Sequence, residues 1–140
     1  MAMSESALPS GLELQQLIRR VPQFASGSFE ARDAIVCCAH QRRTTPGESV
    51  IKRGSAGDAL FFIVEGTFEA QLKDLKVEMR PGEFFGEIGL LFGERTATVV
   101  SKTDGLLLVV PGEFLPRVYD AFPQIQPILD RAARERLKRS

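Results

Sequence analysis

The chain has 140 residues, of which 44% are hydrophobic and 26% are charged, and its formal net charge is zero. This length and composition suit one soluble globular domain, and the even charge balance argues against an overall basic footprint for nucleic acid. No apolar run reaches the roughly 18–20 residues that span a bilayer, and residues 1–11 lack the layout of a signal peptide. We therefore expect a cytoplasmic protein, or the intracellular part of a membrane protein.

Residues for metal or nucleophilic chemistry are few. His40 is the only histidine, and no cysteine or carboxylate cluster accompanies it, so the sequence predicts no zinc or iron site and no His-based triad. Cys37 and Cys38 are adjacent, which disfavours a disulfide between them. We expect these two cysteines to be small buried side chains or free thiols. The sequence thus predicts no metal, no cofactor and no catalytic residues.

The N-terminal part reads as a tail followed by two helices. Residues 1–11 are small and polar with Pro and Gly, and we expect a flexible tail. Apolar residues recur at helical spacing over residues 12–21, and Pro22 ends this helix. A second helix is expected over residues 29–39, with Ser28 as its N-cap. We expect both helices to pack as a small bundle outside the main body. The expected buried side of the second helix consists of Phe29, Ala34, Ile35, Cys37 and Cys38.

From Gln41 to Val110 the pattern changes to short strands separated by Gly and Pro. Residues 59–64 form a continuous apolar run, which is typical of a buried central strand, whereas residues 67–72 alternate between polar and apolar. Short strands spaced roughly 8–12 residues apart predict a jelly roll or barrel. The other expected strands cover residues 43–45, 49–53, 75–79, 95–102 and 106–110.

The C-terminal part is expected to return to helices. A short apolar-faced helix begins near Phe114, and Pro123 separates it from a helix over residues 124–140. This last helix has one apolar stripe and becomes basic toward its end, as the helix dipole favours. Arg136 follows Ile125 by about three helical turns and therefore borders the apolar stripe.

The chemistry is concentrated in residues 81–101, which read PGEFFGEIGLLFGERTATVVS. Gly86 allows backbone to approach a ligand closely, and residues 88–92 suit one helical turn whose N-terminal amides attract an anion. Arg95 brings a planar cationic fork that suits a phosphate. Glu87 would repel phosphate and is better suited to accept hydrogen bonds from hydroxyls. Together these groups describe a ligand with a phosphate and a sugar hydroxyl, which is a nucleotide.

Two segments of this stretch, FGEI at 85–88 and RTATV at 95–99, resemble the phosphate-binding cassette of cyclic nucleotide-binding domains. Residues 54–66 are similar to a strand motif of the same family, and the cassette looks closest to the domains of bacterial potassium channels. The resemblance implies an α+β fold: an eight-stranded antiparallel β-roll, jelly-roll-like, with an inserted one-turn helix, flanked by N-terminal helices and a C-terminal hinge and lid helix pair. The implied domain covers residues 12–140, with N-terminal helices at 12–39, a β-roll at 41–110 containing the cassette at 84–98, and the hinge and lid at 112–140.

The same resemblance assigns roles to single residues. Glu87 is expected to hold the ribose 2′-hydroxyl, Arg95 the cyclic phosphate, and Thr96 to add to the phosphate contact. By its distance from Pro123, Arg136 matches the arginine that the lid of some channel domains places against the base. The Phe84-Phe85 pair is expected to belong to the core rather than to stack on the ligand. The full expected ligand-binding set is Phe85, Gly86, Glu87, Ile88, Arg95, Thr96, Ala97 and Arg136.

The resemblance implies a non-enzymatic sensor of cAMP or cGMP in which the C-terminal lid helix moves to control an effector, such as a channel pore or a partner protein. A threonine at position 96 can bond the guanine of a syn base in this family, which keeps cGMP open. A phosphodiesterase would need a general base or metal beside the phosphate, which the sequence does not offer. A transcription regulator would need a helix-turn-helix after the lid, so binding to nucleic acid is not expected.

One alternative to the sensor remains. The loop at residues 92–94 is about one residue shorter than the family pattern and lacks the proline often found before the arginine. This departure keeps open a degenerate domain that serves as a protein-interaction scaffold without nucleotide, although the intact Glu87 and Arg95 argue against it.

Overall fold

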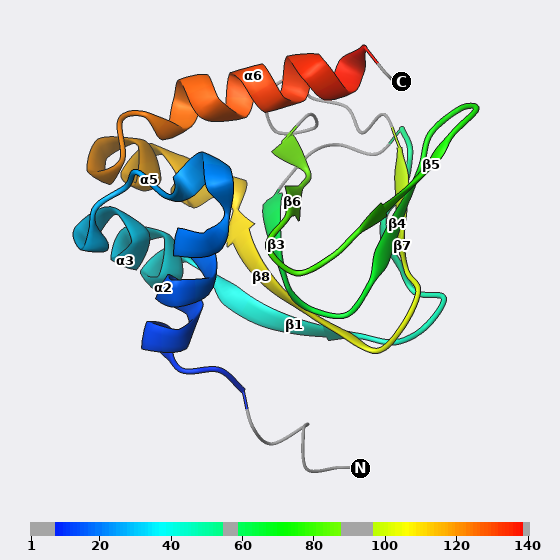
Figure 1. Ribbon diagram of the computed structural model, residues 1–140, viewed down its shortest axis with the longest axis horizontal. Helices are drawn as coiled ribbons and strands as arrows, with labels where there is room; N and C mark the ends of the chain where they lie inside the picture. The colour runs from blue at the N-terminus through cyan, green and yellow to red at the C-terminus, as the bar shows by residue number, and fades with distance from the viewer. Residues whose placement is uncertain (1–7, 55–58, 88–96, 139–140) are drawn as a thin grey trace.

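Eight strands in the described part of the chain form two four-stranded antiparallel sheets (Figure 1). The structure is a computed structural model and describes residues 8–54, 59–87 and 97–138. The first sheet has the order β1 (His40–Thr44), β8 (Gly105–Pro111), β3 (Ala59–Glu65), β6 (Phe84–Phe85). The second sheet has the order β2 (Ser49–Ile51), β7 (Thr98–Ser101), β4 (Phe68–Gln71), β5 (Lys76–Met79). The expected antiparallel roll is thereby confirmed, whereas the expected one-turn helix at 88–92 lies outside the described residues.

The central strands of the first sheet, β8 and β3, are buried on both faces, which explains why residues 59–64 are apolar throughout. Alternate side chains of a strand point to opposite faces. Leu60 and Phe62 pack in a cluster with the helices, whereas Phe61 and Ile63 pack in a second cluster with residues of the other sheet. The continuous run at 59–64 is therefore a central strand between two hydrophobic cores, as the sequence predicts.

The N-terminal helices begin at serine caps. Helix α2 (Gly11–Arg20) starts with a capping box in which Ser10 accepts from the Glu13 backbone N–H and the Glu13 side chain accepts from the Ser10 N–H. Ser28 caps helix α3 (Phe29–Cys38) by accepting from the Ala31 N–H, which confirms its expected role. A short 3-10 helix, η1 (Pro22–Phe24), joins the two.

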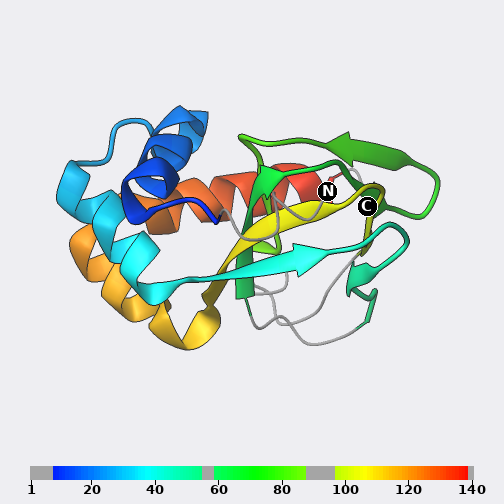
Figure 2. The same ribbon diagram turned by 90° about the horizontal axis from the view of Figure 1, so that it is seen from below.

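The expected buried side of α3 is confirmed for Ile35 and is wrong for Phe29 and Cys37. The buried residues of α3 are Ala31 and Ile35, whereas Phe29 is 52% exposed and Cys37 is exposed as a free thiol. Positions 31 and 35 share one helix face at i, i+4 spacing, and Phe29 and Cys37 fall off that face. The two helices pack against each other beside the roll, as Figure 2 shows from below. Their buried residues share one hydrophobic core with β3 and β8.

The C-terminal helices bring the end of the chain across the roll. After β8 come η2 (Gly112–Phe114), α5 (Leu115–Ala121) and α6 (Ile125–Leu137). Helix α6, in orange and red, crosses the end of the roll next to β6 (Figure 1). Its first half is fixed by Ile125 and Leu129, both fully buried in the core shared with the N-terminal helices. Among the described residues, no helix has the length and apolar character needed to cross a membrane.

Candidate functional site

Strand β6 leads the chain into the candidate site and is anchored in both cores. It pairs with β3, so that Phe84 lies opposite Phe62 and Phe85 opposite Phe61. The Phe85 ring stacks on Phe61 with centroids 5.0 Å apart, and the Phe84 ring meets Phe24 edge-on at 5.4 Å. Both phenylalanines are almost fully buried, which confirms the expectation that the pair belongs to the core. If Phe85 contacts a ligand, its backbone atoms therefore make the contact, because its ring is buried in the core.

Gly86 turns the chain immediately after β6. Its φ of +97° lies in the left-handed region, where a side chain would introduce strain, so glycine is the residue that this turn requires. The turn follows directly on a strand that is fixed on both faces. The position of the next residue, Glu87, is thus defined by the buried phenylalanines behind it.

Glu87 is a buried carboxylate that contacts the C-terminal helix. Its side chain is only 1% exposed, and both of its oxygens accept hydrogen bonds from Nη1 of Arg136, at 2.9 and 2.8 Å. The guanidinium carbon of Arg136 also lies 5.2 Å from the centroid of the Phe84 ring, within the range of a cation–π contact. A buried carboxylate is costly unless it is paired and hydrogen-bonded, and the Arg136 side chain, 26% exposed, supplies such a pair.

The structure brings together one part of the expected ligand-binding set. Phe85, Gly86 and Glu87 are consecutive at the end of β6, and Arg136 reaches Glu87 from α6. Ala97 is half-buried and leads into β7, whereas Ile88, Arg95 and Thr96 lie outside the described residues, as does the loop at 92–94. A contact of Arg136 with a base stays a prediction, and the contact that the structure gives it is with Glu87.

The ion pair between α6 and the end of β6 was not predicted from the sequence. Its partners are 49 positions apart, so no local pattern relates them. One signal was present: Arg136 borders the apolar stripe of its helix, where a long cationic side chain extends along the surface on which the helix packs. That position predicts an arginine near the roll, but it does not identify the acid that it meets.

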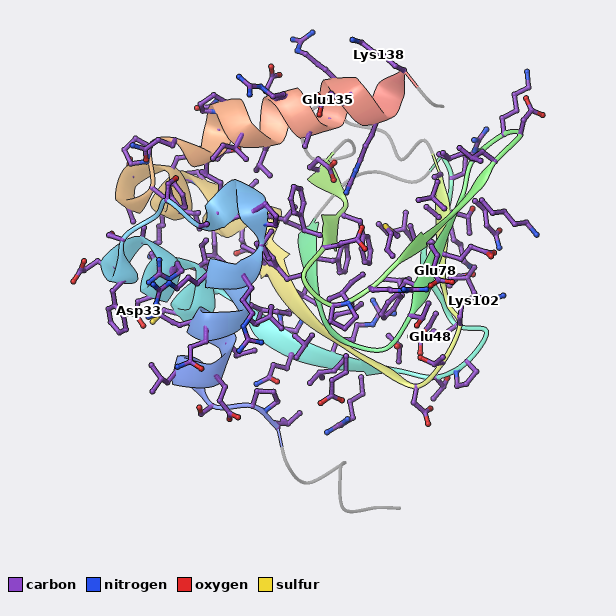
Figure 3. All side chains as sticks on the ribbon, viewed as in Figure 1. Asp33, Glu48, Glu78, Lys102, Glu135 and Lys138 are labelled. Atoms are coloured by element: carbon purple, nitrogen blue, oxygen red, sulfur yellow. The ribbon has the colours of Figure 1, made fainter. Side chains whose placement is uncertain are left out.

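Groups with shifted pKa values also occur away from this site. Glu48 has a pKa below its ordinary value because Arg42 donates a hydrogen bond to it and the Thr45 backbone N–H donates another. The pKa of the exposed Cys37 thiol is raised, first by partial desolvation and then by the neighbouring Asp33 carboxylate. Figure 3 shows Glu48 and Asp33 well away from α6. The shifted pKa values of Glu48 and Cys37 therefore reflect local pairs rather than the candidate site.

Comparison with known proteins relates the chain to one family. The sequence profile described as the cyclic nucleotide-binding domain matches residues 41–122. A cyclic nucleotide-gated potassium channel of Rhizobium etli is 34% identical over 122 residues, which cover 86% of this chain and 34% of the channel. The hyperpolarization-activated cyclic nucleotide-gated channel 3 of Mus musculus is 28% identical over 88% of the chain and 16% of its own length. The chain thus spans about a third or less of these relatives.

Solved structures show the same fold. A cAMP-bound PfPKA-R fragment superposes with a TM-score of 0.81 at 22% identity, covering 91% of this chain and 45% of its own. The catabolite activator protein of Thermus thermophilus superposes with a TM-score of 0.73 at 26% identity, covering 84% of this chain and 59% of its own. The arrangement of two sheets, N-terminal helices and C-terminal helices is therefore shared with proteins of quite different sequence.

Proposed function

Because the chain belongs to the cyclic nucleotide-binding domain family, we propose that it is a sensor that binds cAMP or cGMP at the segment after β6 and does not alter the nucleotide chemically. One observation carries the proposal. Glu87, at the position where the family motif holds the ribose hydroxyl, is a buried carboxylate at a glycine turn and is tied to the last helix. Gly86 and Glu87 would bind the sugar side of the ligand, and Arg95, with Thr96 and Ala97, the phosphate.

The proposed signal passes through α6. A ligand that bonds Glu87 acts on the same carboxylate that holds Arg136, so its binding changes the free energy with which α6 docks on the roll. A helix whose docking energy did not depend on the ligand would transmit nothing. Phe84 extends the connection, because its ring contacts Arg136 on one side and Phe24, at the N-terminal helices, on the other. Both helical ends of the domain are therefore candidate relays to an effector, such as a channel pore or a partner protein.

Calorimetric titration of the chain with cAMP and with cGMP tests the binding step. Arg95→Ala should weaken binding of the preferred nucleotide by about 10- to 100-fold, since a hydrogen bond to a charged group contributes roughly 1.5–3 kcal/mol. Arg131→Ala is the matched control, because Arg131 is exposed on the outer side of α6, and it should leave the affinity unchanged.

Two results would contradict this function. If the folded wild-type chain bound neither nucleotide, the domain would be the degenerate scaffold instead, and protein partners would become the object of search. Chromatography of the titrated sample would detect hydrolysis of the bound nucleotide. Steady hydrolysis would contradict the proposal that the domain does not alter the nucleotide chemically.

A further inference from the structure

The second sheet carries cations at the end where the segment proposed to bind the phosphate joins it. That segment ends at Ala97, and β7 begins with the next residue, Thr98. The backbone N–H of Arg53, just after β2, donates a hydrogen bond to the hydroxyl of Thr98 at 3.1 Å. On the other side of β7, Thr98 lies opposite Gln71 of β4, which in turn lies opposite Lys76 of β5. Arg53 and Lys76 therefore flank the place where the cassette enters the sheet.

We refer to Arg53 and Lys76 as the basic end of the second sheet. Both side chains are exposed, and neither makes an ion pair with another residue in the part of the chain that the structure describes. The β4–β5 turn adds Lys73 and Asp74, whose charges cancel. Because adjacent strands lie about 4.8 Å apart, both cations of the basic end are within roughly 10 Å of the start of β7. Their charges therefore reach a phosphate that approaches the cassette.

The acidic residues of the same sheet lie further along the strands and have cationic partners. Glu69 of β4 lies opposite Glu78 of β5. Lys102 lies 4.0 Å from Glu69, and Arg80 forms an ion pair with Glu78. The charges of the sheet are thus separated along its strands, with the basic end beside the cassette and the paired carboxylates away from it.

We propose that Arg53 and Lys76 steer the nucleotide into the site: their charges raise the rate at which the anionic phosphate reaches the cassette, without contacting the bound ligand. This inference rests on the proposed binding of a cyclic nucleotide, whose phosphate carries a negative charge. A unit charge at about 10 Å in water changes the local concentration of a monoanion roughly twofold. The basic end therefore acts on the association rate constant, and its effect weakens as salt is added.

The test is stopped-flow mixing of the full chain with a fluorescent cAMP analogue labelled on the base. At about 10 mM ionic strength, where charges act over about 30 Å, Arg53→Glu and Lys76→Glu should each lower the association rate constant by about fourfold, because each changes the local charge by two units. The double variant should show the product of the two factors, since the two side chains share no partner. At about 1 M salt, where the screening length is about 3 Å, all variants should match the wild type. The dissociation rate constant should stay unchanged throughout.

Arg19→Glu is the matched control, because it changes the total charge by the same amount at an exposed position in the last turn of α2. Helix α2 lies on the far side of the first sheet from the second sheet (Figure 1), so association should change little. Arg53→Glu keeps the bond to Thr98, since the backbone donates it. If a charge reversal gives no cooperative thermal melt, Arg53→Gln and Lys76→Gln replace it, with an expected loss of about twofold each.

The outcomes separate steering from contact, and both from the proposed function. Association at low salt that is no slower than in the control variant would overturn the inference. Faster dissociation, or a loss that persists at high salt, would also overturn it, because either result shows that the side chain contacts the bound nucleotide. In each of these cases the wild-type chain still binds, so the proposed function survives. Failure of the wild-type chain to bind the analogue, cAMP or cGMP would refute the proposed function and the inference together.

Discussion

The two halves of α6 are attached to the rest of the domain by different forces. In the first half, Ile125 and Leu129 are buried in the hydrophobic core shared with the N-terminal helices. In the second half, Ala132 and Ala133 are also buried, but the last turn makes a polar contact: Arg136 bonds Glu87 and lies over Phe84. Burial of apolar surface depends little on what occupies a distant site, whereas a carboxylate can exchange or share its partners. The start of the helix is therefore held by apolar burial, and its last turn is held by an ion pair at the candidate site.

The largest effect is expected at the apolar first half of α6. Leu129→Ala should lower the free energy of unfolding by about 2–5 kcal/mol, because it removes a fully buried side chain and leaves a cavity. Chemical denaturation measures this, with Gln126→Ala, an exposed position on the same helix, as the control. A loss no larger than that of the control would show that the first half is not an apolar anchor.

A smaller and more local effect is expected at the ion-paired end of α6. Arg136→Gln should lower the free energy of unfolding by about 1–3 kcal/mol, since it breaks an ion pair to a buried carboxylate while Arg136 itself is partly solvated. Native-state hydrogen exchange should show faster exchange in the last turn of α6 and unchanged protection around Leu129. Equal loss of protection along the whole helix would mean that its two halves move as one unit.

The smallest expected effect on the free energy of unfolding is that of a partly exposed ion pair, which contrasts with the buried pair of Glu87 and Arg136. The Arg42–Glu48 pair joins side chains that are 36% and 32% exposed, so its contribution should stay below about 1 kcal/mol. Because the pKa of Glu48 is lower in the folded state than its ordinary 4.5, this contribution is present above pH 4.5 and is lost as the pH falls through the folded-state value.

Unfolding titrations between acid and neutral pH, on the wild type and on Glu48→Gln, measure this contribution. The two stability curves should differ near neutral pH and converge in acid. Curves that stay apart at low pH would contradict the assignment of the shift to the Arg42 hydrogen bond.

Sequence reasoning succeeded where a residue's neighbours in the chain determine its structure. The apolar run of β3 and the Ser28 cap follow from local rules, and the motif around Gly86 and Glu87 has few free positions. It failed where the packing of elements distant in the sequence determines the structure. The core face of α3 is set by what packs against it, so the exposed Phe29 was wrongly placed inside.

Strand β6 and the ion pair with Arg136 illustrate the same limit. Strand β6 has two residues, too few to show a period, and it exists because β3 offers a free edge. The Glu87–Arg136 contact needs the whole roll to bring its partners together. Gly86, Glu87 and Arg136 could thus be named individually as candidates from the sequence, whereas the contact between the site and the last helix could not be predicted.

The position of β8 has a consequence for how the chain reaches this structure. Strand β8 lies between β1 and β3, so that His40 and Phe61 both face Val109 as their partner. The first sheet therefore cannot close until a strand from late in the chain has been synthesised. Pairing over such long sequence separations slows folding, and until then β3 remains without β8, with apolar side chains on both faces. The nascent chain should accordingly depend on protection from aggregation until β8 has left the ribosome.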